Sequence, residues 1–123
     1  MFKKALLFSI VLIFSFSCFL FADVVVSNLV PDKYKVEPIS VNMVYYVDRA
    51  YTIISFPNEL KDATVIRTGN DDKNSKGDGF LKFNINQSAT VYVAHDSRGE
   101  SAKGGVPPEW LSKNFTFIEG KVI

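Results

Sequence analysis

Two short runs near the middle of the chain, residues 80–85 and 89–96, alternate apolar with polar side chains. A period of two places the apolar side chains on one face of a β-strand, so each run predicts a half-buried strand. A three-residue loop at 86–88 would pair the runs antiparallel, with Phe83 opposite Val91. We therefore predict a β-hairpin with one apolar face at this place in the chain.

Similar β-branched and aromatic runs recur along the sequence at intervals of about ten residues, with turn-forming residues between them. No segment keeps a helical period of 3.6 residues. The sequence predicts further strands at 23–30, 34–36, 40–48, 51–56, 63–68 and 115–118, helical turns at 57–60 and 109–112, and polar loops at 69–79 and 97–108. The pattern is typical of an all-β fold, an antiparallel β-sandwich of the jelly-roll or immunoglobulin-like kind.

The first 22 residues have the pattern of a secretory leader. Lys3 and Lys4 precede an uncharged, apolar run at 5–21, and Ala22 is a small residue suited to a cleavage site. We expect a signal peptide at 1–22 and one β-sandwich domain at 23–123, secreted or in the cell envelope. The alternative is an uncleaved leader that anchors the protein in the membrane, because the run approaches the length of a membrane span.

Cysteine and charge exclude several classes of protein. Cys18 is the only cysteine, so cleavage after Ala22 would leave neither a disulfide nor a thiolate metal site. Removal of Lys3 and Lys4 would reduce the 14 basic residues to 12, which is one fewer than the 13 acidic residues. Such a balance lacks the basic patch of a nucleic-acid-binding protein, and the interspersed charges disfavour binding to a membrane surface.

Several runs together resemble a small β-rich module of large secreted or surface proteins of environmental bacteria, sometimes found beside polysaccharide lyase or other carbohydrate-active domains. The runs are YYVDRAYTI at 45–53, TGNDDK at 68–73, FLKF at 80–83, NQ at 86–87, TVYVA at 90–94, DSR at 96–98 and PEWL at 108–111. The resemblance implies a location and neighbouring domains but no activity. Such modules continue with further strands past the run at 108–111, whereas only residues 114–123 remain here, so we expect either a minimal version of the module or a sandwich that lacks its last strands. In the second case an open sheet edge should result.

Aromatic residues are the first candidates for ligand binding, because flat rings stack on the apolar faces of sugars. Tyr46 and Tyr92 lie opposite the most apolar face in the predicted alternation, and Trp110 follows a proline pair. The alternative is structural: tyrosines on a sheet face stabilise cross-strand pairs, and Trp110 would pack beneath its own loop.

Two arginines at predicted strand ends are further candidates. Arg49 follows Asp48 and Arg98 follows Asp96 by two residues. Arginine binds carboxylates through two parallel hydrogen bonds, so both residues could hold a sugar or carboxylate ligand. The alternative is that the two acid–arginine pairs are ion pairs that fix loops at one edge of the sandwich.

The polar loop at 69–79 is rich in acidic residues, and we call it the acidic loop. It suggests a calcium site built from oxygen ligands. Its candidate ligands are Asp71, Asp72, Asn74 and Asp78. Two lysines interrupt the loop and weaken its negative potential, so the alternative is a solvated turn with no cofactor at all.

Enzyme motifs are absent from the sequence, which has no nucleophile elbow, zinc-protease helix, phosphate loop or dinucleotide fingerprint. His95, the only histidine, lacks a well-placed carboxylate because Asp96 would point to the other strand face. We therefore expect a non-catalytic exported module that binds extracellular polysaccharide or organises another surface protein. The alternatives are an assembly module that pairs through an open sheet edge, and a small polysaccharide-cleaving enzyme that uses His95.

Overall fold

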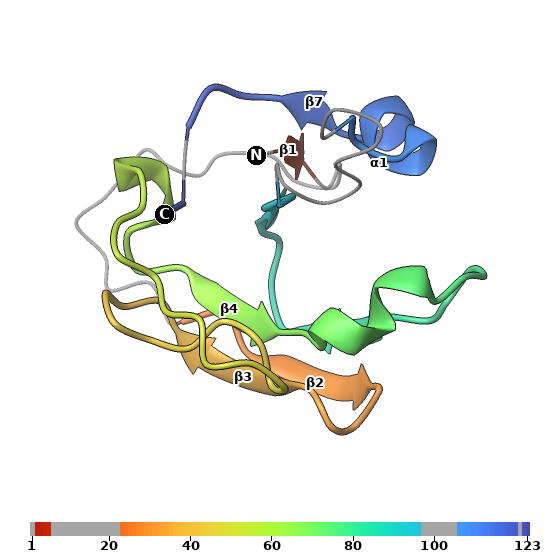
Figure 1. Ribbon diagram of the computed structural model, residues 1–123, viewed down its shortest axis with the longest axis horizontal. Coiled ribbons are helices and arrows are strands. Elements are labelled where there is room, and N and C mark those ends of the chain that lie inside the picture. The colour runs from red at the N-terminus through yellow and green to blue at the C-terminus, as the bar shows by residue number, and fades with distance from the viewer. Residues whose placement is uncertain (1, 6–22, 97–105, 121) are drawn as a thin grey trace. The chain divides into compact units, whose positions relative to one another are not determined.

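The computed structural model describes residues 2–5, 23–96, 106–120 and 122–123 (Figure 1). The chain divides into two compact units. Unit 1 comprises Met1–Phe19 and Ser88–Val122, and unit 2 comprises Leu20–Gln87 and Ile123. Strands outnumber helices among the described residues, so the prediction of a β-rich fold is confirmed. The sandwich arrangement and the domain boundary at residue 23 remain predictions.

Unit 2 contains two antiparallel strand pairs. Strand β2 (Val26–Val30) pairs with β5 (Lys82–Ile85), and β3 (Lys35–Pro38) pairs with β4 (Thr64–Arg67). The alternation predicted for residues 80–85 is seen in β5, where exposed residues alternate with half-buried ones. Each of these strands lies within or overlaps a run that the sequence identifies as extended.

The segment between β3 and β4 differs from the prediction of two strands at 40–48 and 51–56. Instead of continuous strands it forms two isolated β-bridges, one within the segment from Val44 to Thr52 and one from Tyr46 to Thr68, just after β4. Asn42 has a φ of 72°, a left-handed conformation that interrupts an extended strand near its start. Short-range periodicity does not reveal such an interruption.

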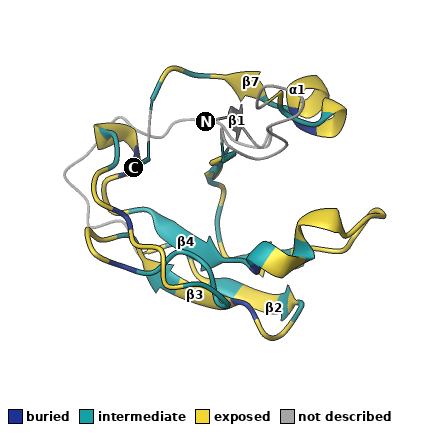
Figure 2. Ribbon diagram, viewed as in Figure 1, coloured by how far each residue is buried: buried dark blue, intermediate teal, exposed yellow. Residues whose placement is uncertain are grey.

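The buried part of unit 2 is small. Its buried hydrophobic residues are Tyr34, Met43, Ile53 and Leu60 (Figure 2). The predicted helical turn at 57–60 is present as the 3-10 helix η2 (Asn58–Leu60), which contributes Leu60 to this core. This core is contributed by the turn between β2 and β3, by the irregular segment between β3 and β4, and by η2.

Unit 1 contains a three-stranded sheet in which the first strand lies in the middle. Strand β1 (Phe2–Ala5) pairs antiparallel with β6 (Thr90–Val93) on one side and with β7 (Thr116–Phe117) on the other. The predicted turn at 109–112 is the helix α1 (Glu109–Asn114), whose Leu111 is only 1% exposed. Leu111 anchors this unit because a buried leucine contributes about 1.5 to 3 kcal/mol.

The predicted hairpin between residues 80–85 and 89–96 was wrong. Both runs are strands, but β5 pairs with β2 and β6 pairs with β1. Alternation indicates which face of a strand is buried, and it does not select the neighbouring strand. Partners distant in sequence replaced the local one in both cases.

Residues 6–22, most of the predicted leader, lie outside the described residues, whereas Phe2–Ala5 at its start forms β1. No helix within the described ranges has the length and apolar character needed to cross a membrane.

Candidate functional site

A cluster of tyrosines is the most distinctive surface feature of unit 2. The ring centroids of Tyr45 and Tyr46 are 4.7 Å apart, and Tyr51 lies 6.3 Å from Tyr45 and 6.5 Å from Tyr46. A backbone hydrogen bond of 3.2 Å from the Tyr45 N–H to the Tyr51 carbonyl brings the two ends of this segment together. Tyr51 is 50% exposed, so the cluster presents aromatic surface to solvent. We call these three residues the tyrosine cluster.

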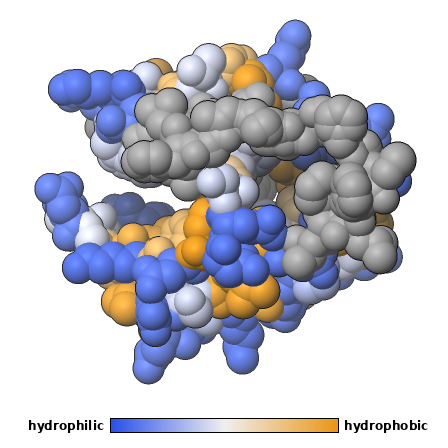
Figure 3. All heavy atoms as spheres, turned by 180° about the vertical axis from the view of Figure 1, so that it is seen from behind, coloured by the Kyte–Doolittle hydropathy of each residue, from blue (hydrophilic) through white to orange (hydrophobic). Residues whose placement is uncertain are grey.

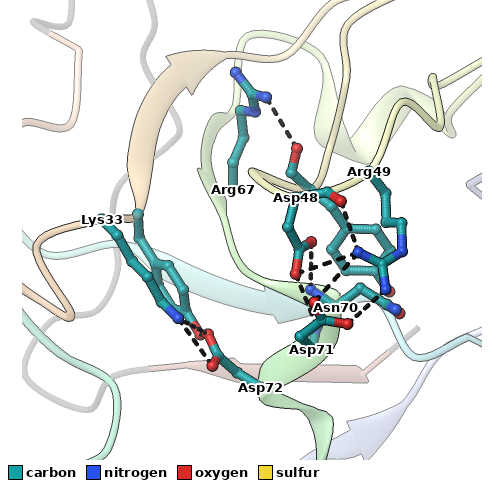
Figure 4. A network of polar contacts seen from close by, with 9 residues as sticks. Lys33, Asp48, Arg49, Arg67, Asn70, Asp71 and Asp72 are labelled. Carbon is teal, nitrogen blue, oxygen red and sulfur yellow. Dashed lines mark hydrogen bonds and ion pairs between the residues drawn. The ribbon is translucent and has the colours of Figure 1, made fainter.

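The turn between Tyr46 and Tyr51 carries Arg49, which is held from two sides. Its Nη2 lies 2.5 Å from Oδ1 of Asp71, and its Nη1 donates a 2.7 Å hydrogen bond to the Asp48 carbonyl (Figure 4). The hydrogen bond to Asp71 is the main cause of a raised pKa for the Arg49 guanidinium. Arg49 is therefore a paired cation in the turn between Tyr46 and Tyr51 of the tyrosine cluster.

Asp48 links the same turn to the acidic loop. Its carboxylate accepts hydrogen bonds from the backbone N–H groups of Asn70, at 2.8 Å, and Asp71, at 2.9 Å (Figure 4). These two donors belong to the first turn of the 3-10 helix η3 (Asn70–Asn74), where backbone N–H groups lack partners within the helix. The hydrogen bond from the Asp71 N–H contributes most to lowering the pKa of Asp48.

Asp72 extends the network to the turn after β2. Its carboxylate accepts a 2.9 Å hydrogen bond from the Lys33 Nζ and a 2.7 Å hydrogen bond from the Tyr34 hydroxyl. The Lys33 bond is the main cause that lowers the pKa of Asp72. Burial, followed by the bond to Asp72, raises the pKa of Tyr34 to about 12.

Arg67 of β4 connects the tyrosine cluster to β3. It donates a 2.9 Å hydrogen bond to the Tyr46 carbonyl and a 3.0 Å hydrogen bond to the Glu37 carboxylate. Its side chain is only 16% exposed, so the backbone of Tyr46 is held by a largely covered group. The tyrosine cluster is thus positioned by both a backbone bridge and a side-chain bond.

The four residues proposed as calcium ligands have different surroundings. Asp71 and Asp72 are engaged by Arg49 and Lys33, while Asn74 and Asp78 are exposed. No group of three or more His, Cys, Asp or Glu residues that could hold a metal occurs in the described part of the chain. Calcium binding stays a prediction, and binding through Asp71 or Asp72 would require these ion pairs to open.

The other predicted site residues belong to unit 1. Tyr92 lies in β6 and is half-buried, and Trp110 lies in α1, is 56% exposed and contacts the Phe115 ring edge at a centroid distance of 6.3 Å. His95 follows β6 and is half-buried. Arg98 falls outside the described residues. Of the predicted ligand-binding residues, Tyr46 and Arg49 are therefore the two that the structure places in one network.

A cleft of about 440 Å³ forms a second feature of unit 2. Its walls come from the segment before and at the start of β2, from the end of β3 and from the start of β4; they include Val25, Val36, Asp23, Glu37 and Asp62. Val25 is 56% exposed and Val36 is 38% exposed. Figure 3 shows hydrophobic surface interspersed with hydrophilic residues on one face of the molecule.

The sequence reasoning missed Tyr45, Tyr51 and the pair Lys33 and Tyr34. The signal for the first two was present, because both flank Arg49 in the run at 45–53. Lys33 and Tyr34 offered no such signal, since their partner Asp72 lies 39 and 38 residues away. A contact of that range follows from the fold alone.

The chain matches no family model, and the searches of curated proteins and of solved structures found no significant similarity. The assignment of a function therefore depends on the chemistry of the tyrosine cluster and of the cleft.

Proposed function

We propose that this protein is an exported, non-catalytic β-rich module that binds extracellular polysaccharide through the tyrosine cluster. One observation carries the proposal: three tyrosine rings lie within 6.5 Å of one another and Tyr51 is half exposed. Tyrosine combines an apolar face with a polar hydroxyl, which suits a ligand that has both apolar ring faces and hydroxyl groups. The leader pattern supports a location where such polymers occur.

A second argument for the proposal is the set of hydrogen bonds that hold the backbone beneath the rings. Tyr46 is held through its carbonyl by Arg67, and the turn that leads to Tyr51 is fixed by Asp48 and Arg49. A preorganised site loses less conformational entropy when a ligand binds. The polar network is thus the scaffold of the proposed site.

A pull-down of the full chain on pectin, alginate, cellulose, peptidoglycan and an immobilised neutral galactomannan tests the proposal. We expect retention on at least one of these polymers, and weaker retention for Tyr51→Ala. Tyr51→Phe keeps the ring and should keep most of the binding, which separates stacking from loss of the fold. No retention on any polymer would refute the carbohydrate function.

The cleft favours a second candidate function, an assembly module that docks against another protein. Exposed valines beside acidic residues suit an extended partner segment in which apolar residues accompany a basic one. Sedimentation without glycan should then show association with a basic, apolar peptide, weakened by Val25→Ser. Val41→Ser is the matched control, because Val41 is 51% exposed but does not line the cleft. Equal effects of the two substitutions would exclude the cleft as the docking surface.

A further inference from the structure

We infer that the tyrosine cluster takes a single chain of neutral sugars, not an acidic polysaccharide and not a crystalline polymer surface. The inference rests on the proposed function and specifies its ligand. It follows from two independent features, the charge state of the surrounding network and the relative tilt of the rings.

Each of the three cations in the polar network that supports the tyrosine cluster already has a carboxylate partner. Arg49 pairs with Asp71 at 2.5 Å, and Arg67 pairs with Glu37 at 3.0 Å. The same holds for Lys33, which lies 2.8 Å from Asp72. An acidic sugar therefore has no spare cation to bind among these three residues.

The charge of the network as a whole also disfavours an anion. Its three cations, Lys33, Arg49 and Arg67, face four carboxylates, Glu37, Asp48, Asp71 and Asp72. A uronic-acid unit that displaced Asp71 from Arg49 would leave a carboxylate unpaired beside a new negative charge. Like charges at this range repel, and the repulsion grows with each acidic unit of the chain.

The same carboxylates favour a neutral, hydroxyl-rich ligand. Asp71 is 68% exposed in its side chain, and an ionised carboxylate has about four acceptor positions. Its bonds to Arg49 leave acceptor capacity toward solvent. Hydrogen bonds from sugar hydroxyls to a carboxylate are charge-assisted and are roughly twice as strong as neutral ones.

The rings do not form a flat platform. The planes of Tyr45 and Tyr51 are tilted by 30°, those of Tyr45 and Tyr46 by 50°, and those of Tyr46 and Tyr51 by 69°. A crystalline polysaccharide presents many sugar faces in one plane and requires coplanar rings for simultaneous stacking. Rings tilted this far suit one sugar chain that is contacted from different directions.

Affinity electrophoresis of the full chain tests the inference. Native gels contain a soluble neutral polymer, either mixed-linkage β-glucan or galactomannan, or an acidic one, either polygalacturonate or alginate. We expect retardation by a neutral polymer only, with little dependence on salt. Tyr51→Ala should weaken binding about tenfold, the change expected for loss of a central aromatic contact. Trp110→Ala, a matched loss of an exposed aromatic in unit 1, should leave binding unchanged.

The other outcomes separate the inference from the proposed function. Retardation by an acidic polymer, abolished in Arg49→Gln, would overturn the inference and leave polysaccharide binding intact. Binding to crystalline cellulose without binding to any soluble polymer would overturn it in the same way. If Trp110→Ala lost binding while Tyr51→Ala kept it, the site would lie in unit 1 and the inference would be overturned. No binding to any polymer would refute the proposed function itself, and circular dichroism of each variant verifies that the fold is retained.

Discussion

Some positions in this protein require a particular residue because of the close contacts around them. Gly69 is an example, because a Cβ atom at this position would lie 2.6 Å from Oδ2 of Asp72. Its φ of −99° is open to any residue, so the requirement for glycine comes from close approach and not from backbone conformation. The carboxylate that it accommodates binds both Lys33 and Tyr34.

Gly69→Ala should therefore destabilise the protein by about 1 kcal/mol, the lower range for overpacking. The measurement is the free energy of urea unfolding. The penalty should shrink in an Asp72→Ala background, because the two substitutions act on one contact. Ser75→Ala, at an exposed position just after η3, is the control and should have little effect. An undiminished penalty without the Asp72 carboxylate would contradict this explanation.

The raised pKa of Tyr34 predicts that the free energy of unfolding decreases at alkaline pH. Its pKa is raised from 10.0 to about 12, so the folded protein favours the protonated hydroxyl. The contribution is fully present below pH 10.0 and is lost as the pH rises toward about 12. The stability difference between the native protein and Tyr34→Phe should therefore be largest below pH 10.0 and decrease above it. A difference that is constant across this range, measured by urea unfolding, would contradict the assigned shift.

At the scale of elements, local patterns predicted the type of element better than its partner. The period-two alternation correctly identified β5, and the proline-led turns correctly located η2 and α1. The same alternation predicted the wrong partner for β5, because pairing with β2 buries its apolar face as well as a hairpin would.

The helix η3 was predicted only as a polar loop. Its first turn is stabilised by the Asp48 carboxylate, which lies 22 and 23 residues earlier in the chain than the two N–H groups that it binds. Local capping signals could not reveal this, since the usual cap comes from a residue adjacent to the helix.

Because β1 is part of the predicted leader, cleavage of the leader should weaken the sheet of unit 1. Strand β1 lies between β6 and β7, and it also lies within the residues that cleavage after Ala22 would remove. The amides of β6 that bond to β1 should then exchange hydrogen at least about tenfold faster in the processed chain than in the unprocessed chain. The amides of β4 that bond to β3 in unit 2 serve as the control. Equal exchange of the β6 amides in both forms would show that β6 keeps another partner after processing.

For the whole molecule, the acidic network determines the expected behaviour in acid. Hydrogen bonds to the carboxylates lower the pKa values of Asp48 and Asp72 below their ordinary value of 3.8. Groups with lowered pKa values stabilise the fold above the unfolded pKa, and this contribution is lost as the pH falls through the folded pKa. We expect the free energy of urea unfolding to decrease below a pH of about 4, and Asp72→Asn to reduce that decrease. An identical acid dependence in the variant would show that Asp72 does not contribute.

The sequence by itself determined the β-rich class, the positions of most short elements and the balance of charge, because these follow from local periodicity, turn chemistry and composition. The tertiary structure alone decided which strands pair and which side chains meet. Tyr45 and Tyr51 form a cluster because a backbone bond closes their segment, and Asp72 reaches Lys33 because the fold brings η3 beside the turn after β2. Pairing and long-range polar contacts depend on the combined burial of many residues, which no local pattern records.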